Sequence, residues 1–352
     1  MNTPIVYSRK TIAVDVGYSH VKAMSDGGAK ASFPSVVAPG DESPLNGLFG
    51  RGVEHRVSVR PFFSQKESAR RHLVGEAALR VLSATATLSR EKPPEIHDVL
   101  LLTAAYLLGA DCAELAAGLP LAYYASQRDA LRRRLEELSA WVSVGDGPER
   151  HITFSRVVVI PQGVGAAFAA NVNLPANGYV GLLDIGCYTT DYLLFEPRSG
   201  SLVPLPGAHG SFELGTHLVQ RALAEAYQAR TGAPLPPRRY GEVLFAAANG
   251  KSVLYRGRPV ELVDVLEEAR ERVARQIART VAAEWGDRVD NLAVVTLTGG
   301  GALIFGDVLK QELGAVETVS DPVYANAAGF LRMLQGAGTV KGAVRTTKTQ
   351  ET

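Results

Sequence analysis

Short runs of apolar residues, many of them β-branched, recur along the chain and have the length of single strands. Each run is bounded by glycine, proline or polar residues, and this pattern predicts buried or half-buried strands. Pro34 lies within one run, which places that strand at the edge of a sheet, where a missing backbone N–H costs no ladder hydrogen bond. The predicted strands span residues 11–16, 21–24, 31–37, 156–160, 179–185, 191–196 and 292–297.

Helical periodicity occupies most of the intervals between these strands. The longest helical pattern, 262–285, aligns residues such as Leu266 and Ile277 on one face and charged residues on the other, as in a helix that packs on a core. A segment rich in glycine, proline and charge, 38–61, predicts a long loop. Strands that alternate with helices predict α/β layers with parallel pairs and two hairpins. The other predicted helices span residues 76–83, 96–108, 126–138, 164–171, 211–229, 302–313 and 321–334.

Length and composition narrow the class of protein. A chain of 352 residues is long enough for two domains, and 46% hydrophobic with 21% charged residues is the balance of an ordinary soluble protein. The formal net charge of +1 provides no bulk field for polyanions, so no direct nucleic-acid contact is expected. The two cysteines, Cys112 and Cys187, are too few for a disulfide scaffold and fit a reducing cytoplasm.

No stretch of the sequence predicts an exported leader or a membrane span. Residues 1–10 lack the apolar core of a signal peptide, and the most apolar helical stretch, 99–108, is too short to cross a bilayer. Residues 336–352 are rich in glycine, threonine and lysine and predict a disordered tail. The expected location is therefore the cytoplasm, with no membrane partner.

A short motif occurs twice, about half a chain apart. In each copy an apolar strand is followed by an aspartate, one apolar residue, a glycine, a few small or polar residues and a second apolar strand. Asp15 and Gly17 belong to the first copy, and Asp184 and Gly186 belong to the second. About one or two Asp-x-Gly sequences are expected by chance in a chain of this length. Two that each join strong apolar strands in a hairpin predict two homologous halves.

The residue types at these turns suit a metal-bound phosphate. Glycine permits a tight turn and a close approach of the backbone to a ligand, and successive N–H groups in such a turn form an anion-binding concavity. If the turns face one another, Asp15 and Asp184 point into one cleft. Mg²⁺, which favours a few carboxylates together with water and phosphate oxygens, then removes their repulsion of phosphate. Lys22 adds a positive charge, and hydroxyl donors are available at Ser19, Thr189 and Thr190.

A glycine-rich connection later in the chain suits a nucleoside. Thr298-Gly299-Gly300-Gly301 follows an apolar strand and precedes a helix. Its backbone can pack under a flat base, and the helix N-terminus favours a nearby phosphate. The chain contains no G-x-x-x-x-G-K-[ST] sequence, and no G-x-G-x-x-G follows the first strand, so neither the P-loop nor the dinucleotide fingerprint is present.

Taken in order, these segments and two small-residue helices resemble the five-motif signature of the actin, sugar-kinase and DnaK-type chaperone superfamily. The motifs are residues 15–22 and 183–191 for phosphate, 297–302 for adenosine, and 161–167 and 325–331 for two connecting helices. The resemblance covers nearly the whole chain. It implies an α/β, actin-like fold, in which two duplicated ribonuclease-H-like domains flank a nucleotide cleft and each carries a smaller subdomain.

The resemblance also implies a division of the chain into domains. Residues 1–176 would form domain I and residues 177–322 domain II. The helix at 323–335 would pack back on domain I, with the tail 336–352 beyond it. Each domain would then contain one phosphate motif.

Within the superfamily the chain is most similar to the ParM/StbA group of bacterial actin-like plasmid-segregation ATPases. The similarity rests on the D-x-G-x-x-x-x-K form of the first motif and on residues 33–36 and 73–78. It implies an ATPase, with ATP and Mg²⁺ as cofactors, that polymerises into filaments and moves plasmid DNA through a DNA-binding adaptor protein. The second phosphate motif departs from the group because Cys187 and Tyr188 follow Gly186, where a second glycine is usual. This departure leaves the hydrolysis rate and the choice between ATP and GTP open.

The nucleotide assignment gives each residue of the motifs a role. Asp15 and Asp184 are expected to hold Mg²⁺ through its waters, and Lys22 to neutralise phosphate charge. Gln162, where the ParM group often has glutamate, would orient the attacking water, and Asp191 would assist as a second water ligand or weak base. The catalytic set is thus Gln162, Asp184 and Asp191. The nucleotide-contacting set adds Gly17, Tyr18, Ser19, Gly186, Cys187, Tyr188, Thr189 and Thr190 at the phosphates, Gly299, Gly300 and Gly301 at the adenosine, and Glu213, at the start of a predicted helix, at the ribose.

Alternatives stay open for single residues and for the function. Gln162 and Asp191 can be purely structural, and a carboxylate such as Glu213 stabilises a helix start whether or not it reaches a ribose. A non-polymerising ATPase switch or scaffold for a protein client, and a small-molecule kinase, would share the same motifs. A sugar kinase normally needs a further acidic base and sugar-binding insertions, for which the sequence offers no clear candidate.

Overall fold

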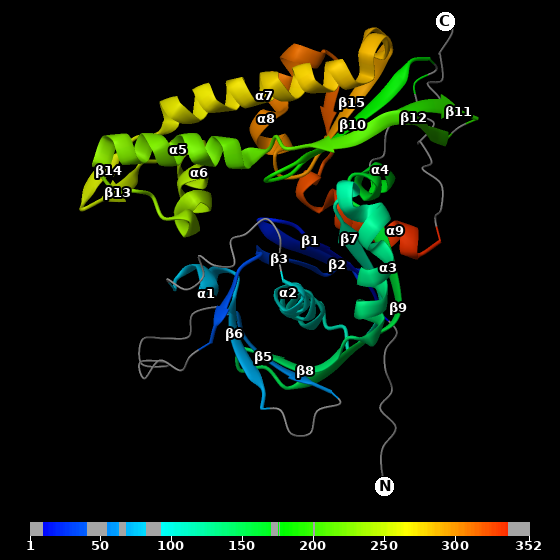
Figure 1. Ribbon diagram of the computed structural model, residues 1–352, viewed down its shortest axis with the longest axis vertical. Coiled ribbons are helices and arrows are strands. Elements are labelled where there is room, and N and C mark those ends of the chain that lie inside the picture. The colour runs from blue at the N-terminus through cyan, green and yellow to red at the C-terminus, as the bar shows by residue number, and fades with distance from the viewer. Residues whose placement is uncertain are drawn as a thin grey trace, which may run out of the picture.

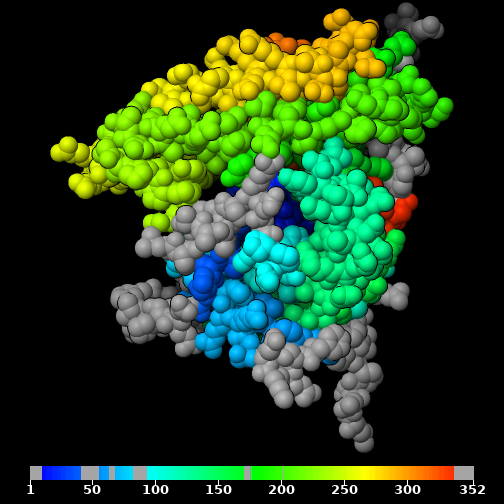
Figure 2. All heavy atoms as spheres, in the orientation of Figure 1, coloured from blue at the N-terminus to red at the C-terminus, as the bar shows by residue number. Residues whose placement is uncertain are grey.

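The computed structural model describes residues 10–40, 55–62, 68–81, 93–169, 175, 177–199 and 201–336. Its strands form a nine-stranded sheet, a five-stranded sheet and a two-stranded ribbon. The two larger sheets come from different halves of the chain, and helices α4 (Val164–Ala169) and α9 (Ala325–Leu334) lie between those halves (Figure 1). In Figure 2 the halves form separate lobes of the surface, with the N-terminal strands (dark blue) visible between them.

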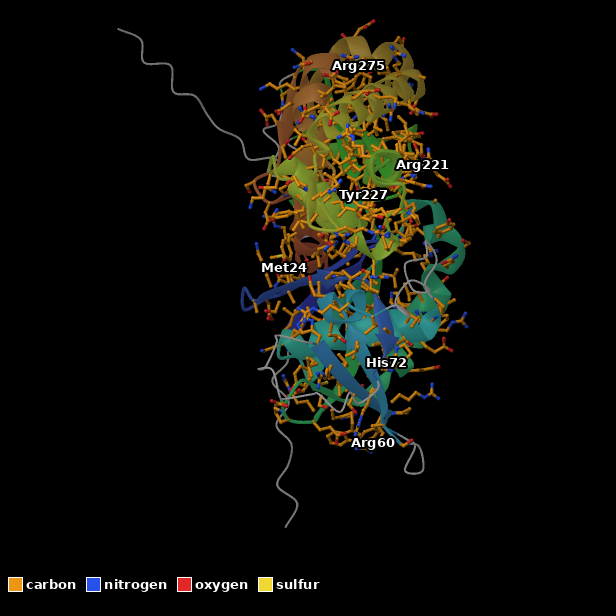
Figure 3. All side chains as sticks on the ribbon, turned by 90° about the vertical axis from the view of Figure 1, so that its left-hand side faces the viewer. Met24, Arg60, His72, Arg221, Tyr227 and Arg275 are labelled. Atoms are coloured by element: carbon orange, nitrogen blue, oxygen red, sulfur yellow. The ribbon has the colours of Figure 1, made fainter. Side chains whose placement is uncertain are left out.

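Figure 3, a side view, shows residues of both lobes and of their boundary. His72 and Arg60 lie on the lower, N-terminal lobe, and Tyr227 and Arg275 lie on the upper one. Met24 lies between these two groups. The second strand of the chain therefore reaches the boundary between the lobes.

The nine-stranded sheet is built around β1 (Lys10–Val16). β2 (His20–Ser25) pairs with β1 antiparallel and β7 (Cys112–Leu119) pairs with it parallel. The sheet has the order β3-β2-β1-β7-β9-β8-β5-β6-β4. Its other strands are β3 (Lys30–Pro34), β4 (Val37–Pro39), β5 (His55–Pro61), β6 (Arg70–Val74), β8 (Ser139–Val144) and β9 (Arg150–Pro161).

Helix α2 (Pro94–Leu107) lies inside the curve of this sheet (Figure 1). Its consecutive residues Leu100, Leu101 and Leu102 are all buried in one apolar cluster with Ile12 of β1. A helix enclosed on several sides needs apolar residues all round rather than one stripe, which explains the continuous apolar run in the sequence. The short α1 (Glu76–Leu79) and the charged α3 (Leu121–Glu137) complete this half.

The five-stranded sheet of the second half has the order β12-β11-β10-β15-β16. β10 (Tyr179–Ile185) lies at its centre and pairs antiparallel with β11 (Thr190–Arg198) and parallel with β15 (Leu292–Thr298). The outer strands are β12 (Ser201–Phe212) and β16 (Val316–Thr318). The separate ribbon joins β13 (Val253–Tyr255) and β14 (Arg258–Val260).

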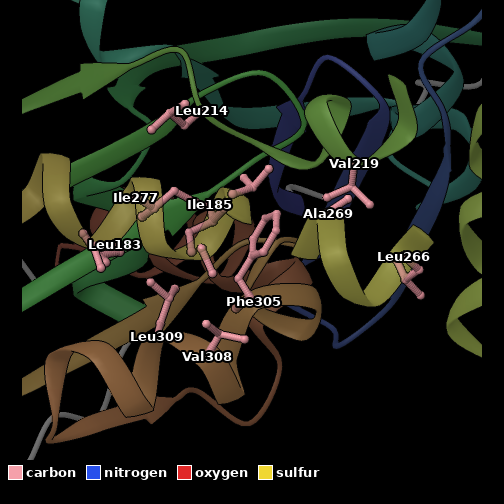
Figure 4. Packing of buried hydrophobic residues seen from close by; sticks show 14 of the residues in the cluster. Leu183, Ile185, Leu214, Val219, Leu266, Ala269, Ile277, Phe305, Val308 and Leu309 are labelled. Carbon is pink, nitrogen blue, oxygen red and sulfur yellow. The ribbon is translucent and has the colours of Figure 1, made fainter. Parts of the chain in front are cut away.

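Helix α7 (Val263–Trp285) supplies the largest apolar face of the second half. Ile277 and Trp285 on that face are fully buried, and Figure 4 shows Ile277 near Leu183 and Ile185 of β10. The sequence-based prediction of this stripe is confirmed. The other helices are α5 (Thr216–Thr231), α6 (Tyr240–Ala248) and α8 (Ala302–Leu313), with 3₁₀ turns at Pro237–Arg239, Gly286–Asn291 and Pro322–Tyr324.

Helices α4 and α9 connect the two halves and pack closely against each other. They meet at glycines, because a Cβ atom at Gly329 would overlap the carbonyl group of Gly165. Phe330 of α9 packs on Ala13 and Ala116 of the first sheet. The chain therefore leaves the first half through α4, forms the second half, and returns through α9 to the first.

Two sequence-based predictions are wrong in part. The loop expected at 38–61 contains β4 and β5, which both pair with β6, while residues 41–54 lie outside the described part of the chain. The helix expected at 211–229 begins only at Thr216, because β12 continues to Phe212. β12 was not predicted because Pro204 and Pro206 are typical of turns. It is an edge strand, where proline is tolerated.

Other elements were not predicted or cannot be checked. The alanine-rich β7 was missed, and β9 begins six residues earlier than the predicted strand at 156–160. Residues 82–83 and 170–171 lie outside the described residues, as does the predicted tail 336–352 except for Gly336. Neither Cys112 nor Cys187 forms a disulfide within the described part of the chain. Among the helices that the structure describes, none is both long and apolar enough to cross a bilayer.

Candidate functional site

The two Asp-x-Gly turns have the same backbone construction. In the first, Val16 pairs with Val21 and the N–H of Gly17 donates to the His20 carbonyl over 3.1 Å. In the second, Ile185 pairs with Thr190 and the N–H of Gly186 donates to the Thr189 carbonyl over 2.8 Å. Each hairpin thus has a four-residue turn closed by the same hydrogen bond. The turns are structural counterparts, although their side chains differ.

The residues opposite the two aspartates give the halves different charge. Asp15 pairs in register with Lys22, whose Nζ lies 3.9 Å from the Asp15 Oδ2. Asp184 pairs in register with Asp191. The first hairpin therefore has an acidic side chain opposite a basic one, and the second has two acidic side chains opposite each other.

Side chains from the two turns touch across the boundary between the halves. The rings of Tyr18 and Tyr188 meet edge to face, with 5.5 Å between centroids. Tyr188 also stacks on His217 of α5 at 4.8 Å, and the backbone N–H of His217 donates to the Cys187 carbonyl over 2.9 Å. The predicted phosphate turns thus face one another, and Tyr188 takes part in the contact between them.

Gln162 lies directly beside Asp15. Its Nε2 donates to the Asp15 Oδ1 over 2.5 Å, and the Asp15 side chain is only 5% exposed. With Lys22 near Oδ2, both oxygens of this carboxylate have a positive or donating neighbour. The amide donation leaves the Gln162 Oε1 as an acceptor for a further donor, such as a water molecule.

Asp184 is held by a hydrogen bond at each oxygen. Thr298 Oγ1 donates to Oδ1 over 3.1 Å, and Asn326 Nδ2 donates to Oδ2 over 2.7 Å. Burial raises the pKa of Asp184 above its usual value, and the charge of Asp15 adds to this effect. The hydrogen bonds from Asn326 and Thr298 and the charge of Lys22 oppose the rise in pKa, because they stabilise the ionised form.

Asp191 is buried and only partly satisfied. Its Oδ1 has no hydrogen-bond partner among the described residues. Burial, followed by the negative charge of Asp184, raises the pKa of Asp191 to about 8. A carboxyl group in this state is mostly protonated at neutral pH and responds to any cation that enters the site.

The number of buried carboxyl groups at the site suits a divalent cation. Asp15, Asp184 and Asp191 are buried together, and the charge of Asp15 raises the pKa of both other acids. Lys22 lies beside Asp15, and its positive charge lowers the pKa of Asp184. In the described part of the chain no three or more His, Cys, Asp or Glu side chains form a direct metal cage. Carboxylates that act through retained water suit Mg²⁺.

The glycine-rich loop after β15 lies against the second turn. Gly299 has a φ of 79°, which favours glycine, and a Cβ atom there would lie 2.7 Å from the Asp184 Oδ1. The N–H of Gly301 donates to the Ile185 carbonyl over 2.8 Å. Gly299 and Gly301 are therefore packed on the protein, whereas a Cβ at Gly300 would have no neighbour within 4 Å. Gly300 is the open position of this loop.

The predicted contact residues Ser19, Thr189 and Thr190 differ in how deeply they are buried. Ser19 remains partly exposed in its turn, and its carbonyl accepts from the N–H of Ser35 over 2.8 Å. Thr190 is fully buried, and its hydroxyl donates to the Leu214 carbonyl over 2.8 Å. The Thr190 hydroxyl is thus engaged within the protein, while Thr189 is partly exposed in the turn.

Glu213 does not start a helix, contrary to the prediction. It follows β12 directly and lies three residues before Thr216, where α5 begins. Its exposed side chain belongs to a connector that packs on the second turn, because a Cβ at Gly215 would overlap the Cys187 carbonyl group. The helix dipole therefore does not explain why a carboxylate occupies this position. Contact of Glu213 with the ribose stays a prediction.

Sequence reasoning missed three residues of this region. Asn326 joins Asp184 to the start of α4, His217 supports the Tyr188 ring, and Leu303 in the first turn of α8 is 65% exposed beside the glycine loop. Only Leu303 had a local signal, since it is a large apolar residue directly after three glycines. The other two act through partners far away in the sequence.

Comparisons in sequence match both halves of the chain. The model described as actin like proteins N terminal domain matches residues 13–165, and that described as archaeal actin homologue MreB-like, C-terminal, matches residues 182–311. An archaeal actin homolog from Thermoplasma volcanium is 26% identical over 332 residues, which are 91% of this chain and 97% of the relative.

Comparisons in structure match nearly the whole chain. A 15-stranded ParM filament from Clostridium botulinum has a TM-score of 0.82 at 24% identity, over 93% of this chain and 99% of its own subunit. An archaeal actin homolog in complex with ADP has a TM-score of 0.70 at 21% identity, over 92% and 99% respectively. These likenesses establish the fold, and the predicted α/β architecture with two sheet-based halves is confirmed.

Proposed function

We propose that this chain, which has an actin-like fold, binds ATP with Mg²⁺ between its two halves, hydrolyses it and assembles into filaments. The observation that carries the proposal is the pair of equivalent turns that touch across the boundary and hold buried carboxylates behind them. An actin homolog bound to ADP and a ParM filament, both of the same fold, support it.

The residues divide the work of phosphoryl transfer among them. Asp15 and Asp184 would hold Mg²⁺ through water, and the metal would supply positive charge to neutralise the phosphates. The backbone N–H groups of the two turns would hold the phosphates, with Lys22 adding charge. Gln162 would orient the attacking water through its Oε1, since its Nε2 donates to Asp15. Asp191, once ionised, would accept a hydrogen bond or proton from that water.

The adenosine would lie on the second half of the molecule. The open backbone at Gly300 and the exposed side chain of Leu303 offer a flat surface for the base. Glu213, which lies exposed in the connector before α5, would contact the ribose hydroxyls. The proposed domains, 1–176 and 177–322, would close on the nucleotide through the crossing helices α4 and α9.

Filament formation is the part of the proposal that involves other molecules. The partners would be further copies of this chain and a DNA-binding adaptor protein, with plasmid or other DNA segregation in the cytoplasm as the biological role. The net charge of +1 gives no reason for direct binding to DNA. A monomeric ATPase switch that binds a protein client remains the competing function.

A single set of assays tests these functions. Light scattering and negative-stain microscopy with ATP, with ADP and without nucleotide are expected to detect filaments that depend on ATP, alongside phosphate release. Release without any assembly would favour the monomeric switch and overturn the filament proposal. Absence of nucleotide binding by the folded protein would overturn the site itself.

The same assays test the metal-facing carboxylate. Asp184→Ala is expected to lower phosphate release about 100-fold, the upper end for loss of a metal-supporting group, with an unchanged circular dichroism spectrum. The matched control is Asp307→Ala, which removes an exposed carboxylate of α8 and should hydrolyse at the wild-type rate. Wild-type turnover in Asp184→Ala would contradict the assignment.

A further inference from the structure

We propose that Asn326 is a positioning residue that fixes the carboxylate of Asp184 relative to the two crossing helices. The inference rests on the proposed nucleotide function and adds to it a residue outside the predicted site. Asn326 lies in the first turn of α9 and is 8% exposed. Its hydrogen bond to Asp184 joins it directly to one of the carboxylates proposed to hold the metal.

Both the oxygen and the NH₂ group of the Asn326 carboxamide form hydrogen bonds. Its Oδ1 accepts from the N–H of Gly163 over 3.0 Å and from the N–H of Ala166 over 3.2 Å. These amides lie at the start of α4, where a helix leaves N–H groups without intrahelical partners. Its Nδ2 donates to the Asp184 Oδ2 over 2.7 Å. One side chain therefore contacts α4 and β10 while it belongs to α9.

The surroundings dictate which way the amide points. If the group were flipped, its NH₂ would face two N–H donors and its oxygen would face a carboxylate, so three contacts would become repulsive. The donor must therefore point at Asp184. An aspartate at this position would have the same shape and accept the same two N–H groups, but when ionised it would have no proton to donate.

The position of Asn326 links the carboxylate to the hinge. α4 carries the chain out of the first half, α9 carries it back, and Asp184 belongs to the sheet of the second half. A rotation at the close contact of Gly165 and Gly329 would move the Nδ2 donor relative to Asp184. The orientation of the metal-facing oxygens and the angle between the halves are thus coupled through one amide.

The variant Asn326→Leu, similar in size, separates this role from simple packing. Its side chain has no N–H to donate to Asp184. We expect its affinity for a fluorescent ATP analogue with Mg²⁺ to fall about 10- to 100-fold relative to wild type, the usual effect of removing a group that orients a metal ligand. In EDTA, where no metal is bound, its affinity for the analogue should stay within about threefold of wild type.

The wild type, measured with Mg²⁺ and in EDTA, is the reference for both conditions. Asn326→Ala removes the acceptor and the donor together and should show the same loss of affinity with Mg²⁺. Thermal melting without nucleotide establishes that each variant is folded.

The outcomes are distinct. Wild-type affinity with Mg²⁺ in Asn326→Leu, or a loss that is equally large in EDTA in a folded protein, would overturn the positioning role. Failure of the wild type itself to bind the analogue would instead overturn the proposed function, and this inference with it. Weak binding with Mg²⁺ and nearly normal binding in EDTA is the expected result, and a structural role alone would not produce it.

Discussion

At the scale of single residues, the two halves share a backbone design but differ in chemistry. Lys22 and Asp191 occupy the same register position, each opposite the aspartate that ends the preceding strand. In the proposed site the two turns would therefore have different tasks. Lys22 would place a basic side chain near the phosphates, and Asp191 would supply a buried acid.

The buried acid leads to a prediction about pH. Burial and the charge of Asp184 raise the pKa of Asp191 to about 8. A base acts only in its ionised form, so hydrolysis of saturating ATP should rise with pH and level off above that value. The positive charge of bound metal would lower the midpoint without reversing the direction. Steady-state phosphate release measured from pH 6 to pH 9 checks this.

The matched variant is Asp191→Asn, which keeps the shape of the side chain. We expect phosphate release to fall about 100-fold, the lower end for a general base, and its remaining pH dependence to be flat across the same range. Nucleotide affinity should change much less than turnover. A wild-type rate in this variant would assign Asp191 a structural role only.

At the scale of elements, the sequence predicted what local patterns encode. The strands that end at Asp15 and Asp184 and the stripe of α7 all have short-range signals, and all three are present. β12 was missed because Pro204 and Pro206 read as turn residues, although an edge strand tolerates them.

Long-range contacts explain what the sequence could not predict about the site. Asn326 bonds to Gly163 and Asp184, which lie 163 and 142 positions away. A single asparagine in a small-residue helix has no local pattern that distinguishes it. The resemblance to a known family located the segment, but only the packing of α9 on α4 brought its amide to the carboxylate.

The close contact between α4 and α9 can be tested directly. A Cβ at Gly329 would overlap the Gly165 carbonyl, and backbone cannot move aside as a flexible side chain can. Gly329→Ala is therefore expected to lower the free energy of unfolding by about 1–3 kcal/mol, as overpacking does. The control is Gly241→Ala in α6, where an added Cβ meets nothing within 4 Å. Urea midpoints of both variants decide the matter, and equal midpoints would contradict the packing argument.

At the scale of the whole molecule, the halves are joined at places well apart in the chain. The crossing helices form one connection and the rings of Tyr18 and Tyr188 form another. Lys30 of β3 forms a further connection, with its Nζ 2.5 Å from Asp321 and 4.9 Å from the centre of the Tyr324 ring. The Lys30–Asp321 pair is exposed and contributes little. The aromatic contact between the turns is thus the better candidate for coupling closure to the ligand.

That contact predicts how fast nucleotide leaves. An aromatic pair contributes about 0.5–1.5 kcal/mol beyond its buried area, so Tyr188→Ala should speed the release of a fluorescent ADP by about 2- to 13-fold, the same free energy expressed as a rate. Tyr188→Phe keeps the ring and should release ADP at nearly the wild-type rate. Stopped-flow displacement with excess unlabelled ADP measures both.

The double variant distinguishes a contact between the halves from a local effect of Tyr188 on its own turn. If the rings of Tyr18 and Tyr188 act together, removing Tyr18 first already breaks the pair, and the second substitution should add little. Effects on the ADP release rate that simply add would mean that each tyrosine acts within its own half. Because His217 also stacks on Tyr188, Tyr188→Ala should still speed ADP release to some extent in the Tyr18→Ala background. The non-additive part alone therefore measures the coupling between the lobes.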